Sequence, residues 1–202
     1  MPSISSNAVR CEPQQERSTR RLASFLDSAA ELFVEVGFEA ATMTAIAERS
    51  GASIGTLYHY FPDKLAVASA LLNQYANEIE AQWRPLIDQA PTLTHQKFAD
   101  LFIQRITEFV KERPAYLKLI TAPTRFSRDP AARKALRMVI ANAFRAKNPA
   151  LSSESAYLIA NVALQIVKGL PMLYTETSLK DKPLVEAEFK KALSLYLGSA
   201  LS

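Results

Sequence analysis

Residues 54–60 carry the side chains in this sequence that are best suited to contact nucleic acid. The run reads Ile-Gly-Thr-Leu-Tyr-His-Tyr, so a threonine hydroxyl, two phenols and an imidazole follow one another closely. Such groups donate hydrogen bonds to phosphate oxygens and to base edges. The small residues at its start would let the backbone approach DNA closely. If the run is helical, its outward residues are Ile54, Gly55, Thr56, Tyr58, His59 and Tyr60.

Two capped helices and a glycine turn are predicted to position this run. Thr42 is a typical N-cap, and it begins a predicted helix over residues 43–50 that Gly51 ends. Ser53 caps the next predicted helix, which covers residues 54–60. A short helix, a glycine-containing turn and a second short helix form a helix-turn-helix, whose second helix enters the major groove of DNA.

Longer helices are predicted on either side of this pair. Apolar residues recur at helical spacing over residues 17–37, and the glycine at the end would supply a left-handed turn. A fourth helix would open at Pro62 and end near Pro85 or Pro91. Lys64 then lies in its first turn, where an ammonium group and a helix N-terminus would both favour phosphate.

The rest of the sequence also predicts helices, and no stretch alternates as a strand does. The predicted helices include residues 98–109, 115–121, 130–147, 152–175 and 184–199. The one at 152–175 is apolar on nearly all sides, which is typical of a helix buried on both sides. The predicted fold class is therefore all-α. Its parts are a flexible arm (1–16), a three-helix DNA-binding domain (17–64) and a larger helical domain for effector binding and dimerisation (65–202).

Composition excludes several classes of protein. Hydrophobic residues make up 49% of the chain, which supports a real core. Cys11, the single cysteine, has no partner for an internal disulfide. No apolar signal segment begins the chain, and no stretch reaches the roughly 18 uncharged apolar residues of a membrane span. We therefore expect a cytoplasmic protein without a membrane partner.

Net charge does not by itself indicate DNA binding. The formal charge is +4, but acidic residues outnumber basic ones over residues 1–64. Only the local cluster of Arg17, Arg20 and Arg21 provides a basic patch there. The prediction therefore depends on the geometry of the motif.

These residues resemble the TetR-type transcriptional regulators. The similarity runs from Arg17 to about Leu65 and includes the patterns Ala-Ala-Glu-Leu-Phe at 29–33 and Thr-Met-Thr-Ala-Ile-Ala at 42–47. Its most specific part is Gly-Thr-Leu-Tyr-His-Tyr-Phe-Pro-Asp-Lys at 55–64. The resemblance implies an all-helical body that encloses an effector pocket and forms a homodimer through its last two long helices.

The resemblance also implies which residues contact DNA. The matching positions are Thr42, Thr44, Ser53, Ile54, Thr56, Tyr58, His59, Tyr60 and Lys64. Ala45 stands where an acidic residue is common in the family. Ile54 stands where a longer polar residue often reads bases, and it would touch a thymine methyl group instead.

Residues of the larger domain are assigned to the two implied roles. For the effector pocket we predict Phe102, Phe126, Arg133, Tyr157, Asn161 and Gln165. For the dimer interface we predict Ala160, Val167, Phe189, Leu193 and Tyr196. The basic run over residues 125–147 is most simply a solvated helix face. The alternative is an anion site for an acidic effector, built from Arg125, Arg128 and Arg133.

An enzyme fits the sequence less well. Residues 51–55 spell G-x-S-x-G, the nucleophile elbow of serine hydrolases, but a helix is predicted where that elbow needs a buried strand. The two histidines, His59 and His95, complete no catalytic triad. With Cys11 they do not make up a metal-ligand set either. We expect no catalytic residues, no metal site and no cofactor.

The sequence therefore predicts a ligand-responsive DNA-binding regulator. We expect a repressor that binds a palindromic double-stranded operator as a homodimer. An unidentified small-molecule effector would release it from the operator. Activation or co-repression by the ligand is the alternative within the same fold. A helical interaction module without DNA binding is a further rival, and the intact Thr56, Tyr58 and Lys64 argue against it.

Overall fold

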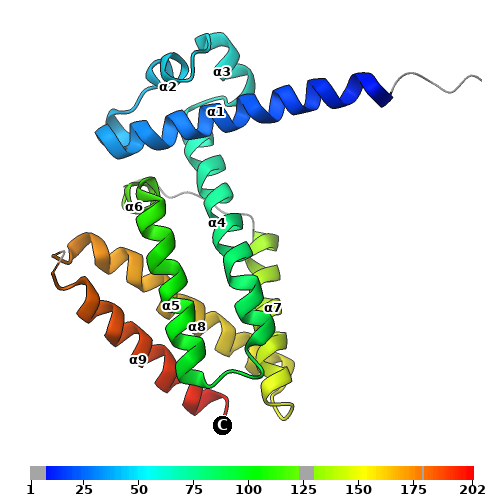
Figure 1. The fold of residues 1–202 in the computed structure, drawn as a ribbon, viewed down its shortest axis with the longest axis vertical. Coiled ribbons are helices and arrows are strands. Elements are labelled where there is room, and N and C mark those ends of the chain that lie inside the picture. The colour runs from blue at the N-terminus through cyan, green and yellow to red at the C-terminus, as the bar shows by residue number, and fades with distance from the viewer. Residues whose placement is uncertain (1–7, 123–129, 179) are drawn as a thin grey trace, which may run out of the picture. The chain divides into compact units, whose positions relative to one another are not determined.

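The computed structural model describes residues 8–122, 130–178 and 180–202, with side chains described from Gln15 onward. Every regular element in these ranges is a helix (Figure 1), which confirms the predicted all-α class. The chain forms two compact units, one ending at Leu71 and the other beginning at Leu72.

The first unit carries the predicted helix-turn-helix. Its elements are α1 (Ala8–Ala40), α2 (Met43–Arg49), α3 (Ile54–Tyr60) and the start of α4 (Lys64–Gln89). The second unit holds the rest of α4 and five further helices. These are α5 (His95–Glu112), α6 (Pro114–Ile120), α7 (Pro130–Lys147), α8 (Ser153–Glu176) and α9 (Lys182–Ala200).

Helix α1 begins at Ala8, so the predicted flexible arm is wrong for residues 8–16; residues 1–7 lie outside the described part. The prediction relied on the absence of an apolar stripe before Arg17. Extending an existing helix needs no new nucleus, and Gln14, Gln15 and Glu16 next to Arg17 have good helix propensity. An exposed ion pair between Arg20 and Glu16, at 2.9 Å and one turn apart, is consistent with this extension.

Gly37 interrupts α1 near its end. Its φ of 78° is positive, as the predicted glycine turn requires, but its ψ of 167° lies outside the left-handed helical region. Phe38 then folds back onto Phe33, with ring centroids 5.7 Å apart. The core of the first unit includes Phe25, Phe33, Ile46 and Leu57, each wholly buried.

Packing in the second unit joins helices that are far apart in the sequence. Helix α5 lies against α9, and α8 lies against both α7 and α9 (Figure 1). The wholly or almost wholly buried side chains include Phe102, Ile103, Phe109, Ile140 and Phe144. All of these except Ile103 belong to the apolar stripes that predicted the helices at 98–109 and 130–147.

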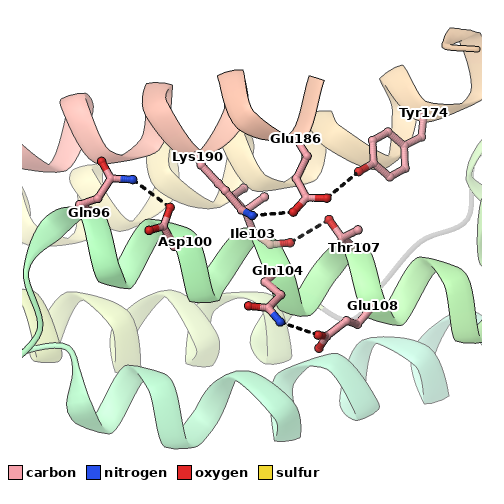
Figure 2. A network of polar contacts seen from close by, with 9 residues as sticks. All are labelled: Gln96, Asp100, Ile103, Gln104, Thr107, Glu108, Tyr174, Glu186 and Lys190. Atoms are coloured by element: carbon pink, nitrogen blue, oxygen red, sulfur yellow. Dashed lines mark hydrogen bonds and ion pairs between the residues drawn. The ribbon is translucent and has the colours of Figure 1, made fainter. Parts of the chain in front are cut away.

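A polar network lies where α5, α8 and α9 meet (Figure 2). The hydroxyl of Tyr174 on α8 donates to Glu186 Oε2 on α9 at 3.4 Å, and Lys190 pairs with Oε1 at 2.6 Å. The buried Thr107 of α5 donates to the Ile103 carbonyl. Burial raises the pKa of the Tyr174 hydroxyl, which therefore remains a neutral donor.

Helix α8 has one buried face and one exposed face within a single chain. Ala160 and Val167 are wholly buried, whereas Leu158 is 64% exposed and Val162 and Met172 lie at the surface as well. Helix α8 is long and apolar enough to cross a membrane by length and composition alone, although Glu154 and Lys168 interrupt its uncharged stretch. Core helices of soluble proteins meet the same criterion, so this is weak support for a membrane span.

The turn between α2 and α3 provides a test of the fold. Gly51 has a φ of 65°, and a Cβ added there would meet nothing within 4 Å. We expect Gly51→Ala to lower the free energy of unfolding by about 1 kcal/mol, purely through the cost of the left-handed backbone. Urea-induced unfolding followed by circular dichroism measures this change.

Gly55→Ala is the matched control. Gly55 lies inside α3, and an added Cβ would come no closer than 3.9 Å to Ser53 Oγ. Alanine favours the helix over glycine by up to about 1 kcal/mol, so the control is expected to keep or raise stability. Equal losses in both variants would contradict the assignment of the effect to the backbone at Gly51.

Candidate nucleic-acid interface

Hydrogen-bonded caps fix the two helices of the motif. Thr42 Oγ1 accepts a hydrogen bond from the Ala45 amide at 3.1 Å, and Ser53 Oγ accepts one from the Thr56 amide at 3.1 Å. Both predicted caps are therefore confirmed. Helix α2 precedes Ser53, so the strand-turn-helix geometry of a nucleophile elbow is absent from this described segment.

Helix α3 has one side in the core and the other in solvent. Leu57 is wholly buried, whereas Tyr58 is 52% and Ile54 is 38% exposed. Gly55, Thr56 and His59 are exposed too. The outward orientation predicted for these five residues is confirmed, while their contact with DNA stays a prediction. A helix supported on its inner side and free on its outer side has the geometry needed to enter a groove.

Tyr60 differs from the other predicted contacts because it is half-buried. Its hydroxyl lies 3.2 Å from Ser18 Oγ, and its ring meets Phe25 edge-on at 5.5 Å between centroids. Tyr60 therefore ties α3 to α1. The sequence analysis missed Ser18, although its spacing of seven from Phe25 places the two on one face of a helix.

An ion-pair cluster links α1 to α2. Arg49 donates to both carboxylate oxygens of Glu35, at 2.7 and 2.6 Å, and Glu31 lies 3.9 Å away. The hydrogen bonds from Arg49 lower the pKa of the Glu35 carboxyl. Two acidic residues of α1 thus pair with a basic residue of α2 inside the unit. Thr42 and Thr44, at the start of α2, remain exposed.

Comparison with known proteins identifies both units. Residues 25–71 match the family described as bacterial regulatory proteins, tetR family, and residues 94–197 match the one described as tetracyclin repressor-like, C-terminal domain. The chain belongs to the TetR family. Its first unit thus carries the helix-turn-helix domain of this family of bacterial regulatory proteins, and the relatives that it matches are named transcriptional regulators or repressors.

Individual TetR-family relatives are similar over different shares of the chain. The HTH-type transcriptional repressor KstR of Rhodococcus jostii is 30% identical over 129 residues, which cover 64% of this chain and 55% of that relative. The chain thus spans about half the length of this relative. A TetR-family regulator of Streptomyces coelicolor has a similar fold, with a TM-score of 0.66 at 20% identity over 89% of this chain and 99% of that chain. A TetR variant of Acinetobacter baumannii in complex with minocycline gives a TM-score of 0.63 at 15% identity, over 88% and 94% of the two chains.

Lys64 occupies a different environment from the predicted one. Its Nζ donates to the carbonyl oxygens of Phe38, Glu39 and Ala41, at 2.7, 2.8 and 2.8 Å. It also lies 4.6 Å from the centre of the Phe38 ring. An ammonium group has three hydrogens, so these contacts use all of its donors. The predicted phosphate contact therefore needs correction: Lys64 holds the end of α1 against the start of α4 within this TetR-family domain.

Three predicted effector residues lie on α8. Tyr157, Asn161 and Gln165 are spaced one turn apart, and Asn161 Nδ2 donates to the Tyr157 carbonyl at 2.9 Å. Tyr157 and Asn161 are half-buried and Gln165 is exposed. One donor of the Asn161 side-chain amide is therefore already bound within α8 and is not free for an effector.

The other predicted effector residues are dispersed. Phe102 of α5 is 1% exposed and stacks on Trp83 with ring centroids 4.4 Å apart. Arg133 of α7 is exposed. Phe126 lies outside the described residues, as do Arg125 and Arg128, so the structure does not test the anion site that the sequence left open.

The predicted dimer residues separate into two groups. Ala160, Val167 and Leu193 are wholly buried within one chain and have no surface to offer a second copy, so the prediction needs correction there. Phe189 and Tyr196 are half-buried. The Phe189 ring packs against Gly169, where an added Cβ would lie only 3.3 Å away. An apolar helical stripe in sequence does not distinguish a protomer's own core from an interface.

The environment of Lys64 leads to a prediction. Lys64→Met keeps the apolar stem but leaves three carbonyls without their donor, so we expect a loss of about 2 kcal/mol in the free energy of unfolding. The dependence of DNA affinity on salt should stay unchanged, because Lys64 releases no counterion from DNA. Urea unfolding and salt titrations of DNA binding measure the two effects. A flatter salt dependence with unchanged stability would restore the phosphate contact.

Proposed function

We propose that this chain is a ligand-responsive repressor that binds a palindromic operator as a homodimer. The exposed outer side of α3, supported by the buried Leu57, is the observation that carries the proposal. KstR, the similar protein from Rhodococcus jostii, is named a transcriptional repressor, which supports repression as the direction of control. Two copies would place their α3 helices about one DNA turn, ~34 Å, apart.

The second half of the proposal concerns the dimer. The exposed apolar residues of the last two long helices are Leu158, Val162, Met172 and Leu173 on α8, and Leu184 and Leu195 on α9. Leu158, Val162 and Met172 lie on one stripe of α8 together with Gln165 and Gly169. Exposed apolar side chains that recur along one side of a helix support a protein interaction site there. This stripe replaces Ala160, Val167 and Leu193 in the proposed interface.

The effector is proposed to bind in the second unit, beside the stacked Trp83 and Phe102. Trp83 is 3% exposed, and its buried indole N–H has no acceptor in the part of the chain that the structure describes. A buried donor without an acceptor is costly, so an oxygen of a bound molecule would stabilise it. The minocycline complex of the similar TetR structure supports a small-molecule ligand in this fold.

Helix α4 provides the connection by which an effector would act. It runs without interruption from Lys64 in the first unit to Gln89 in the second, and it carries Trp83. A ligand would release DNA only if it binds one spacing of the two reading helices more tightly than the other. The proposed effector contact therefore lies on the same helix that forms the end of the DNA-binding unit.

DNA binding is tested at Tyr58. Replacing the exposed Tyr58 with alanine is expected to weaken operator binding by about 1–3 kcal/mol, because a direct contact is lost from the outer side of α3. Fluorescence anisotropy with DNA from upstream of the regulator's own gene measures the affinity. Tyr157→Ala, in the second unit, is the control and should leave operator affinity without effector unchanged. An unaltered affinity in the Tyr58 variant would remove that contact from the proposal.

The dimer is tested at Leu158. Leu158→Glu places a charge in the proposed interface, so we expect dissociation into chains of 22.4 kDa in sedimentation velocity experiments. The control is Met138→Glu on α7, whose side chain is 40% exposed but lies on another helix. The control should remain dimeric. A dimeric Leu158 variant would contradict the proposed interface.

A further inference from the structure

An open hollow lies between residues 17–24 of α1 and the side of α3. It measures about 400 Å³ and is lined by three arginines and two serines of α1 and by Thr56 and Tyr60 of α3. We call it the arginine hollow, after Arg17, Arg20 and Arg21. Residues 17, 20, 21 and 24 share one face of α1, and Thr56 and Tyr60 are one turn apart on α3.

The walls of the arginine hollow are tied together. Ser18 and Tyr60 lie 3.2 Å apart through their hydroxyl oxygens, and Tyr60 also packs edge-on against Phe25. The side of α3 that bears Thr56 is therefore held next to the arginines of α1. The Thr56 hydroxyl lies 2.8 Å from Oγ of Ser53, the cap of α3, so Thr56 connects the lining of the hollow to that cap.

Positive charge in the arginine hollow is only partly compensated. All three arginines are exposed, and Arg20 pairs with Glu16 at 2.9 Å. No ion pair of Arg17 or Arg21 is recorded among the described residues. The acidic residues Glu31 and Glu35, farther along α1, pair with Arg49 instead. The charge balance of the first unit as a whole is therefore a poor guide to this hollow.

We propose that the arginine hollow binds the phosphate backbone of DNA at the edge of the groove that α3 enters. This inference rests on the proposed DNA binding by α3. Guanidinium groups match phosphate oxygens in geometry and charge, and they stay charged at all relevant pH values. Because Thr56 belongs both to the outer side of α3 and to the hollow, a strand that reaches Thr56 passes the arginines. Such contacts add affinity for any DNA sequence and leave the choice of sequence to α3.

Arginine variants test the proposal by salt titration. The probes are an operator duplex selected with the wild-type protein and a scrambled duplex of the same length. We expect Arg17→Gln and Arg21→Gln each to weaken binding to both duplexes about tenfold. The slope of log affinity against log salt concentration should fall by about two, because each of the two copies loses a phosphate contact. The ratio of the two affinities should not change. Arg105→Gln, an exposed arginine of α5 that pairs with Glu108 at 3.0 Å, is the matched control and should change nothing.

Glu16→Gln gives a change in the opposite direction. It frees Arg20 from its carboxylate partner, so affinity for both duplexes should rise about threefold, an effect that misfolding cannot produce. Unchanged salt slopes in the arginine variants would overturn the phosphate site. So would a fall in the affinity ratio, since that indicates contact with bases. If the wild-type protein selects no operator at all, the proposed function fails, and that result is separate from either outcome.

Discussion

Burial of Leu57 is the constraint on which the DNA-binding unit depends. Helix α3 has only seven residues, which is far too short for a stable helix in water by itself. It exists because Leu57 is inserted into the core formed with Phe25, Phe33 and Ile46, and because Ser53 caps its first turn. The outer residues of α3 therefore owe their fixed position to side chains that never reach DNA.

Charged and polar groups of the first unit divide into two sets. One set holds the helices in place: Lys64 on the carbonyls at the end of α1, Arg49 on Glu35, and Tyr60 on Ser18. The other set, which includes Tyr58, His59 and Arg17, is exposed. An ammonium group with three carbonyl partners has no donor left for a phosphate. Lys64 therefore holds helices in place and is not available to DNA. Residue type alone does not show this division.

Local signals in the sequence predicted the motif well. Thr42 and Ser53 are caps, Gly51 has the expected positive φ, and α3 covers the predicted residues. These features depend on a few neighbouring residues. Lys64 and Ala160 were assigned incorrectly because their environments depend on residues far away in the sequence: carbonyls 23–26 positions earlier for Lys64, and the packing of α7 and α9 on α8 for Ala160. The early start of α1 was missed for a different reason, since this helix extends beyond the apolar stripe that predicted it, and extension needs no new nucleus.

The charge distribution explains how a unit with an acidic balance can still approach DNA. Coulomb interactions between exposed groups fade beyond about 10 Å at 0.1 M salt, so a DNA strand senses the charges nearest to it and not the total. Glu31 and Glu35 are engaged with Arg49, whereas Arg17 and Arg21 stand beside Thr56 on the hollow next to α3. Because α1 begins at Ala8, Arg17 and Arg21 lie inside a helix that the buried Phe25 anchors. A flexible arm with the same arginines would lose more conformational entropy on reaching the same strand.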